Sequence, residues 1–213
     1  MAFFDLDESG IVKLFGLRKT LVALYWPNQT KGLRPLSLLT TLLVILGVLV
    51  ISLSAQIQIP FYPVPVTMQT FAVLVIGMAF GRWLGALTVS VYLIAAILGL
   101  PVLAGSSERS ADFELLTGPT SGFLTGFIVA VWAVGWLGEL GWGKSFRWTL
   151  CAMVIGTCII LTLGMLWLTF TYSWSGEQVL KSLLGLMPGA ILKILLASIL
   201  VPYLWRKDIS AGH

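Results

Sequence analysis

The amino-acid sequence predicts an all-α integral membrane protein, a compact bundle of six transmembrane helices with both termini in the cytoplasm. Composition, uncharged runs and the placement of basic residues lead to this prediction. Hydrophobic residues make up 58% of the 213-residue chain, charged residues make up 10%, and the mean hydropathy is +0.96. Soluble domains carry about 25% charged residues, so this chain has too few charges to cover a water-exposed surface. Most of its length is therefore expected to lie in lipid.

Four stretches without Asp, Glu, Lys, Arg or His indicate the spans. They run over 35–81, 83–107, 115–137 and 148–176. Each exceeds the roughly 20 residues that a spanning helix needs. The first is long enough for two spans. Pro60, Pro63 and Pro65 divide it, because proline cannot continue a helix. We predict spans at 36–57, 67–81, 84–103, 120–140, 148–171 and 183–204.

The basic residues of the connecting segments gather on one side of the membrane. With the N-terminus in the cytoplasm, only Arg109 and Lys181 lie outside. The inside segments hold Lys13, Arg18, Lys19, Lys31, Arg34, Arg82, Lys144, Arg147, Arg206 and Lys207. The positive-inside rule predicts this asymmetry for six spans, whereas five or seven spans would split the basic residues between the two sides. The expected location is the cell (plasma) membrane, with multiple passes.

Three regions follow from these spans. Residues 1–35 are expected to form a cytoplasmic or interfacial segment, in which residues 11–22 interleave basic and apolar side chains. This pattern is compatible both with a helix on the membrane surface and with a tail. Residues 36–205 form the predicted six-helix transmembrane domain, and residues 206–213 form a cytoplasmic tail.

Glycines recur at every fourth position in two places. One series joins the second span to the third, and the other opens the fourth span: Gly77, Gly81 and Gly85, then Gly118, Gly122 and Gly126. Glycines at this spacing line one helix face and let backbones approach closely in lipid. We assign them to helix packing in a compact bundle.

The fourth and fifth spans carry aromatic and sulfur side chains. Trp132 and Trp136 lie inside a span and are expected to pack or to line a cavity. Tryptophans near span ends, such as Trp205, are expected at the membrane interface. Cys151 and Cys158 are seven residues apart, roughly 10 Å along a helix, which is too far for a disulfide. We expect both to be packing residues.

The sixth span contains Lys193, the only ionisable side chain well inside a predicted span. Burying a lysine there costs about 2.5–3.5 kcal/mol on an insertion scale. A polar cavity that receives an anion would offset that cost. A structural lysine is the alternative, and we interpret Lys193 as an anion-binding residue.

A polar outer loop over residues 105–118 carries both signs of charge. It includes Ser106, Arg109 and Asp112. Loops of this length in a compact bundle are often functional. A solvated loop with internal ion pairs is the alternative.

A second outer segment, residues 63–70, is stiffened by prolines where it leads into the second span. Thr67, Gln69 and Thr70 supply hydroxyl and amide groups there. These groups are candidates for ligand contact, and a helix cap is the alternative.

Four ordered motifs resemble the BioY family of biotin transporters and together cover about residues 60–205. They are Pro63-Val64-Pro65-Val66-Thr67-Met68-Gln69-Thr70, the stretch from Leu84-Gly85-Ala86-Leu87 to Gly99-Leu100-Pro101-Val102-Leu103-Ala104-Gly105, Leu116-Thr117-Gly118-Pro119-Thr120-Ser121-Gly122-Phe123-Leu124-Thr125-Gly126-Phe127, and Pro188-Gly189-Ala190-Ile191-Leu192-Lys193. The last resembles the Pro-Gly-Asp-x-x-Lys motif of the family's sixth helix. Each motif alone is weak, but four in order at family-like separations are specific.

The resemblance implies the S component of an energy-coupling-factor (ECF) importer, which captures biotin from outside and carries out no catalysis. Its expected partners are biotin, the lipid bilayer, an ECF transmembrane scaffold subunit and two cytoplasmic ATPases, with function by the subunit alone left open. No cofactor, metal or nucleic acid is expected. The residues expected to bind substrate are Lys193, Arg109, Gln69, Ser106, Asp112 and Thr120.

Two positions depart from the family pattern. Ala190 stands where the motif has Asp, which removes a carboxylate partner for the ureido N–H groups or for the lysine. Asp112 and Ser106 are candidates to replace that carboxylate. The first span, 36–57, lacks the Ala-x-x-x-Ala pair through which S components typically dock on their scaffold. Coupling to a shared scaffold is therefore left open.

Two other functions remain in view. One is an S component for another carboxylated vitamin or for a biotin precursor such as desthiobiotin, which the Ala190 departure motivates. The remote alternative is an intramembrane enzyme in which Ser198 or Ser182 acts with Lys193 as base. The chain has no G-x-x-x-x-G-K-[ST] loop for ATP. It also lacks the paired repeats and intramembrane carboxylates typical of ion-coupled transporters.

Overall fold

The computed structural model describes Thr20 and residues 38–60, 65–103 and 118–209, with side chains described as far as Trp205. The helices in these ranges are α3 (Leu38–Gln56), α4 (Gln69–Phe80), α5 (Arg82–Ile97), α7 (Ser121–Glu139), α8 (Phe146–Tyr172) and α9 (Gly176–Ile209), with a short 3-10 helix η3 (Trp142–Lys144). The predicted all-helical class is confirmed for the described chain. Its one departure is a small hairpin in which β1 (Gln58–Ile59) pairs antiparallel with β2 (Val66–Thr67).

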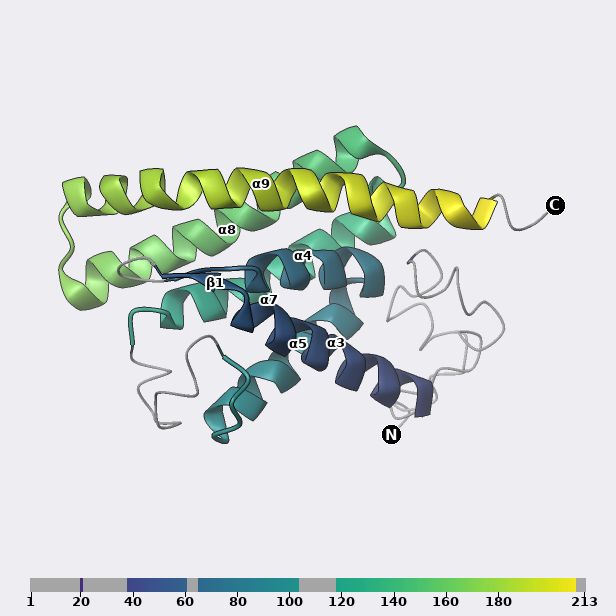
Figure 1. The fold of residues 1–213 in the computed structure, drawn as a ribbon, viewed down its shortest axis with the longest axis horizontal. Coiled ribbons are helices and arrows are strands. Elements are labelled where there is room, and N and C mark those ends of the chain that lie inside the picture. The colour runs from purple at the N-terminus through teal and green to yellow at the C-terminus, as the bar shows by residue number, and fades with distance from the viewer. Residues whose placement is uncertain (1–19, 21–37, 61–64, 104–117, 210–213) are drawn as a thin grey trace, which may run out of the picture.

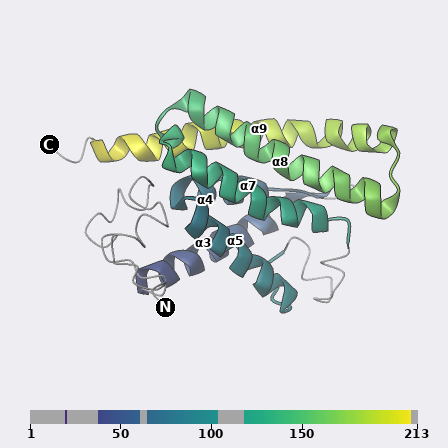
Figure 2. The same ribbon diagram turned by 180° about the vertical axis from the view of Figure 1, so that it is seen from behind.

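The helices form one bundle around α7 (Figure 1). Helix α7 contacts α8 on one side and α4 and α5 on the other, while α9 packs on α8 and α4, and α3 packs on α5 and α4. The start of α3 and the end of α9 lie at the same end of the bundle, and the hairpin and the α8–α9 turn lie at the opposite end (Figures 1 and 2). The described chain therefore returns to the end from which it starts.

Four described helices are long and apolar enough to cross a membrane: α3, α7, α8 and α9 as far as Trp205. Helices α4 and α5 have 12 and 16 residues, which at 1.5 Å per residue gives about 18 and 24 Å. They are shorter than the predicted spans for two local reasons. Residues 66–67 pair with β1 before α4 begins, and α5 ends at Ile97, two residues before Gly99, whose φ is +89°.

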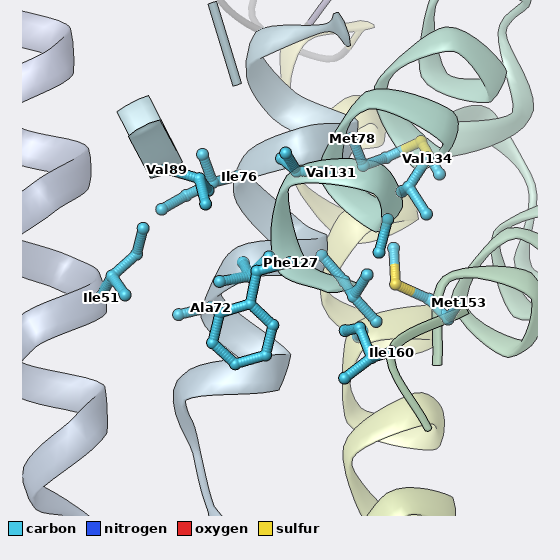
Figure 3. Close-up of a cluster of buried hydrophobic side chains, with 14 of the residues drawn as sticks. Ile51, Ala72, Ile76, Met78, Val89, Phe127, Val131, Val134, Met153 and Ile160 are labelled. Carbon is cyan, nitrogen blue, oxygen red and sulfur yellow. The ribbon is translucent and has the colours of Figure 1, made fainter. Parts of the chain in front are cut away.

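A buried apolar cluster joins α3, α4, α5, α7 and α8 at the centre of the bundle (Figure 3). Its members include Ile51, Ala72, Ile76, Met78, Val89, Phe127, Val131, Val134, Met153 and Ile160. Large apolar side chains also cover the outer faces of α3 and α9, as Leu42, Leu53, Leu184 and Ile199 show. An apolar exterior around an apolar core suits a protein whose solvent is lipid.

The glycine series brings helices into close contact, as predicted. A Cβ on Gly77 would lie 2.9 Å from the carbonyl oxygen of Val131 in α7, and a Cβ on Gly85 would lie 3.3 Å from the Cα of Gly77. A Cβ on Gly126 would lie 3.1 Å from the Cα of Ile160 in α8. These distances leave no room for a side chain, so the glycines set the spacing of α4, α5, α7 and α8.

Several side-chain predictions for the spans are wrong. Trp132 and Trp136 are 40% and 45% exposed on α7 instead of packed. Trp205, near a predicted span end, is 8% exposed and packs inside the bundle. Cys151 and Cys158 are unpaired, as expected, but they are exposed on α8 and not packing residues. Charge-free runs locate a helix in the chain, but they carry little information about which face turns inward when all faces are apolar.

Helix α9 is longer than predicted, because it begins at Gly176 and contains both Pro188 and Pro202. A span at 183–204, as predicted, would have Pro188 in its first turns, whereas Pro188 lies well inside α9. A proline inside a helix removes one backbone hydrogen bond and crowds the preceding turn. Its neighbour Gly189 faces the hairpin, where an added Cβ would lie 2.7 Å from Cγ1 of Val66.

Candidate functional site

The ammonium of Lys193 lies between α9, β2 and the first turn of α4. Its Nζ donates to the carbonyl oxygen of Thr67 at 3.0 Å and to Oγ1 of Thr70 at 2.7 Å. The side chain is partly buried. The two neutral oxygens provide some of the solvation that the ammonium loses on leaving water. The tertiary structure thus joins the lysine and the proline-stiffened loop that the sequence singled out separately.

Local sequence explains why this strand approaches this helix. Gly189 precedes Lys193 by four residues, so both lie on one face of α9. Because Gly189 has no side chain, Val66 of β2 approaches the helix at this point. The backbone N–H of Met68 donates to the carbonyl oxygen of Ile57 at 3.0 Å and closes the hairpin. That closure fixes the point from which α4 starts.

The electrostatics of the site favour an anion. Within the described part of the chain, the ion pairs are Arg82 with Glu139 and Lys181 with Glu177, so Lys193 has no carboxylate partner there. Helix α4 also begins at this site, and its N-cap residue, Met68, makes no side-chain capping hydrogen bond. The uncapped helix start adds partial positive charge beside the ammonium.

Gln69 lies next to Thr70 in sequence but turns into the bundle, where it is 4% exposed. Its Nε2 donates to the hydroxyl oxygen of Tyr92 at 2.6 Å, and the Tyr92 hydroxyl donates to the carbonyl oxygen of Val102 at 3.1 Å. This chain of hydrogen bonds ties α4 to α5 and to the segment after it. In this arrangement the amide nitrogen of Gln69 holds α4 against α5. Contact of Gln69 with substrate stays a prediction.

Sequence reasoning missed Tyr92, which is fully buried. A signal was present, because a phenol in the middle of an apolar span needs a hydrogen-bond partner in a medium without water. The identity of that partner depends on which helices meet. It was therefore not available from the local sequence.

The other predicted site residues divide into two groups. Thr120 is the N-cap residue of α7, where its side chain makes no capping bond; its carbonyl oxygen accepts from the backbone N–H of Phe123 and Leu124. Nearby, Nε1 of Trp167 donates to the carbonyl oxygen of Gly118 at 3.0 Å. Ser106, Arg109 and Asp112 lie outside the described residues, and their predicted roles stay predictions.

The serine–lysine dyad considered as an alternative does not form. The Oγ of Ser198 donates to the carbonyl oxygen of Ile194 at 2.7 Å within its own helix. The described partners of the Lys193 ammonium are Thr67 and Thr70, with no serine among them. A base that is not within hydrogen-bond reach of the hydroxyl cannot activate it in this arrangement.

Glu139 is the buried carboxylate that sequence analysis overlooked at the end of a span. It is 8% exposed, its Oε1 accepts from the backbone N–H of Arg82 at 2.9 Å, and its Oε2 lies 3.4 Å from Nε of Arg82. Arg82 opens α5, so Glu139 holds the start of that helix against the end of α7. These two contacts with Arg82 offset the cost of burying the Glu139 carboxylate, so no ligand is needed to explain its burial.

Comparison with known proteins places this geometry in context. The model of the BioY family matches residues 28–208. The chain is 38% identical over 120 residues to the biotin transporter BioY of Thermotoga maritima, covering 56% of this chain and 68% of that protein. It is 29% identical over 179 residues to the biotin transporter BioY of Rhizobium etli, covering 81% and 91%. It is 34% identical over 149 residues to the probable biotin transporter BioY of Pyrococcus horikoshii, covering 70% and 86%.

A solved structure has the same fold. The S-component for biotin from an ECF-type ABC transporter matches with a TM-score of 0.66 and 24% sequence identity, covering 79% of this chain and 89% of that one. The likeness extends to most of both chains and supports the arrangement of helices described above.

Proposed function

The chain belongs to the BioY family, and from that premise we propose that it takes up biotin, as the high-affinity substrate-capturing S component of an ECF-type importer. The observation that carries the ligand assignment is Lys193, an ammonium inside an apolar helix with two neutral oxygen partners and no carboxylate partner among the described residues. Such a group favours a ligand that brings its own negative charge.

Biotin matches this site in three chemical respects. Its carboxylate pairs with Lys193, its ureido ring needs hydrogen-bond donors and acceptors, and its thiophane ring and chain suit apolar walls. Arg109 is proposed as a second cation for the carboxylate, and Ser106 or Asp112 as the acceptor for the ureido N–H groups. Gln69 and Thr120 are proposed as further substrate-binding residues.

The proposed topology has six passes, with the short helices α4 and α5 as the second and third, and both termini in the cytoplasm of a multi-pass plasma-membrane protein. The distribution of basic residues supports it, as does the return of the chain to one end of the bundle (Figure 1). Residues 1–35, 36–205 and 206–213 are proposed as the cytoplasmic or interfacial segment, the transmembrane domain and the cytoplasmic tail.

The proposed partners are an ECF transmembrane scaffold subunit and two cytoplasmic ATPases, because the chain lacks an ATP-binding loop of its own. Membership of a transporter family also agrees with the expectation that the chain is not an enzyme. The first span lacks an Ala-x-x-x-Ala pair, so the alternative is that the subunit takes up biotin alone. Biotin uptake by vesicles reconstituted with and without the partner subunits distinguishes the two.

Equilibrium binding of labelled biotin to the purified chain in detergent tests the ligand assignment. We expect near-stoichiometric binding that excess unlabelled biotin displaces. Competition with other carboxylated vitamins and with desthiobiotin tests the alternative ligand class. If one of them competes better than biotin, the S-component role stands and the substrate changes.

Replacing Lys193 with Ala should weaken biotin binding at least tenfold, about 1.4 kcal/mol, because the carboxylate loses its cation. Lys181→Ala is the matched control, since Lys181 lies on the same helix, has a 74% exposed side chain and pairs with Glu177. Its affinity should equal that of the unaltered protein. An unchanged affinity in folded Lys193→Ala protein would remove the basis of the proposal.

A further inference from the structure

We propose that Thr70 binds the ligand carboxylate together with Lys193, so that the two side chains form a clamp selecting a free carboxylate over a neutral amide or ester. This inference rests on the proposed function and adds a specificity-determining residue to it. It follows from the hydrogen atoms that the two groups still have available once their mutual contact is made.

The donor count at the site leaves two hydrogens for a ligand. An ammonium has three donors, and Lys193 uses two of them on the carbonyl oxygen of Thr67 and on Oγ1 of Thr70. A hydroxyl has one donor and two acceptor lone pairs. Thr70 accepts from the lysine, and within the described part of the chain its own hydrogen has no acceptor. Nζ and Oγ1 are 2.7 Å apart, so the two free hydrogens lie on adjacent atoms.

The position of Thr70 explains why its hydroxyl hydrogen is not used. Helical threonines elsewhere donate to a carbonyl oxygen three or four residues earlier, as Thr125 does to Gly122 and Thr88 does to Leu84. Thr70 is the second residue of α4, so the residues three and four positions earlier, Thr67 and Val66, lie in β2 and not in the helix. The carbonyl oxygen of Thr67 accepts from Lys193 instead. The helical acceptor is therefore missing, and the hydroxyl is left for another partner.

A carboxylate is the ligand group that fits two such donors. Its two oxygens accept two hydrogen bonds at once, and bonds to an ionised acceptor are shorter and stronger than neutral ones. A neutral amide has one acceptor oxygen, so with that oxygen on the ammonium its NH₂ group would face the donor hydrogen of Thr70. The clamp therefore discriminates between acid and amide more strongly than Lys193 alone would.

The clamp is also assembled before the ligand arrives. The long side chain of Lys193 is already held by two oxygens, and β-branched Thr70 has few side-chain rotamers available. Binding then loses less conformational entropy than it would with a free lysine.

Paired substitutions at Thr70 test this proposal with biotin and biotinamide as probes. Thr70→Val keeps the shape and removes the hydroxyl, and we expect it to weaken biotin binding about fivefold to tenfold. Its binding of biotinamide should change less than twofold. Thr70→Ser keeps the hydroxyl and should retain most of the biotin affinity.

Thr88→Val is the matched control. Thr88 is fully buried and its hydroxyl is used within its own helix, so both probes should bind as to the unaltered protein. In a Lys193→Met background, Thr70→Val should have little further effect on biotin, because the clamp is already broken.

The outcomes separate the clamp from the function on which it rests. Loss of biotin and biotinamide binding in equal measure would show a merely structural role for Thr70 and overturn the clamp, as would unchanged biotin affinity in Thr70→Val. Failure of the unaltered protein to bind biotin would instead overturn the proposed function, and the clamp with it. If Thr70→Val does not fold, loss of biotin affinity in folded Thr70→Ser would contradict the proposal.

Discussion

At the scale of single residues, two buried polar groups show how the bundle accommodates charge and hydrogen-bonding capacity in lipid. Lys193 meets two oxygens from the hairpin and α4, and Tyr92 links Gln69 to Val102. In each case α4 supplies one of the partners, Thr70 for Lys193 and Gln69 for Tyr92. Removal of one partner leaves the other unsatisfied where no water replaces it.

Tyr92→Phe should destabilise the protein by about 1–3 kcal/mol, because Nε2 of the buried Gln69 loses its acceptor. Thermal unfolding in detergent measures the effect as a lowered midpoint. Tyr203→Phe is the control, since Tyr203 is 60% exposed on α9 and should leave the midpoint unchanged. Equal midpoints for the two variants would show that the Gln69–Tyr92 bond contributes no stability.

At the scale of elements, the hairpin and the turn of α9 that contains Pro188 and Gly189 determine where the site forms. The β1–β2 hairpin occupies chain that would otherwise lengthen the second helix. Helix α9 continues through Pro188, and the glycine after it lets β2 approach. The short α4 and the long α9 are therefore linked, because the hairpin that shortens one packs on the other.

Gly189→Ala should weaken biotin binding, because the new Cβ would lie 2.7 Å from Cγ1 of Val66 and would push β2 and Thr67 away from Lys193. We expect a loss of about threefold or more in equilibrium binding. Adding Val66→Ala removes the obstructing methyl group and should restore affinity. Gly176→Ala is the control on the same helix, since a Cβ there meets nothing within 4 Å.

Restoration by Val66→Ala separates a local clash from a general loss of helix stability. If Gly189→Ala binds biotin normally, β2 is free to shift without moving Thr67. That result would contradict the role assigned to the close approach of strand and helix.

At the scale of the whole molecule, an apolar outer surface surrounds an apolar core. The described chain starts and ends at one end of the bundle (Figures 1 and 2). The connection of α7 to α8 carries Lys144 and leads to Arg147 in the first turn of α8. This connection lies at that end, and the α8–α9 turn lies at the other. This arrangement fits a membrane protein whose basic end faces the cytoplasm.

Cysteine accessibility in intact cells tests this orientation. In a Cys151→Ser/Cys158→Ser background, Lys181→Cys should react with a membrane-impermeant maleimide from outside, and Lys144→Cys should react only after the cells are opened. Both side chains are exposed in the structure. The reverse pattern would place the termini outside.

Composition and charge determined the membrane class, the approximate position of each helix and the presence of an anomalous lysine. These properties are local, because the solvent preference of a segment depends on its own side chains. They could not predict the short α4 and α5, the hairpin, or the exposed faces of Trp132 and Trp136, because an apolar helix has no polar face to show which side turns inward.

Only the tertiary structure decided what surrounds Lys193. Its two oxygen partners are 126 and 123 positions away in sequence, and they reach it only because α9 packs on α4 and Gly189 admits β2. The same packing leaves the hydroxyl of Thr70 without its helical acceptor. A charged residue inside an apolar span can be recognised in the sequence, because burying it in lipid is costly. The groups that offset that cost depend on which segments the fold brings together.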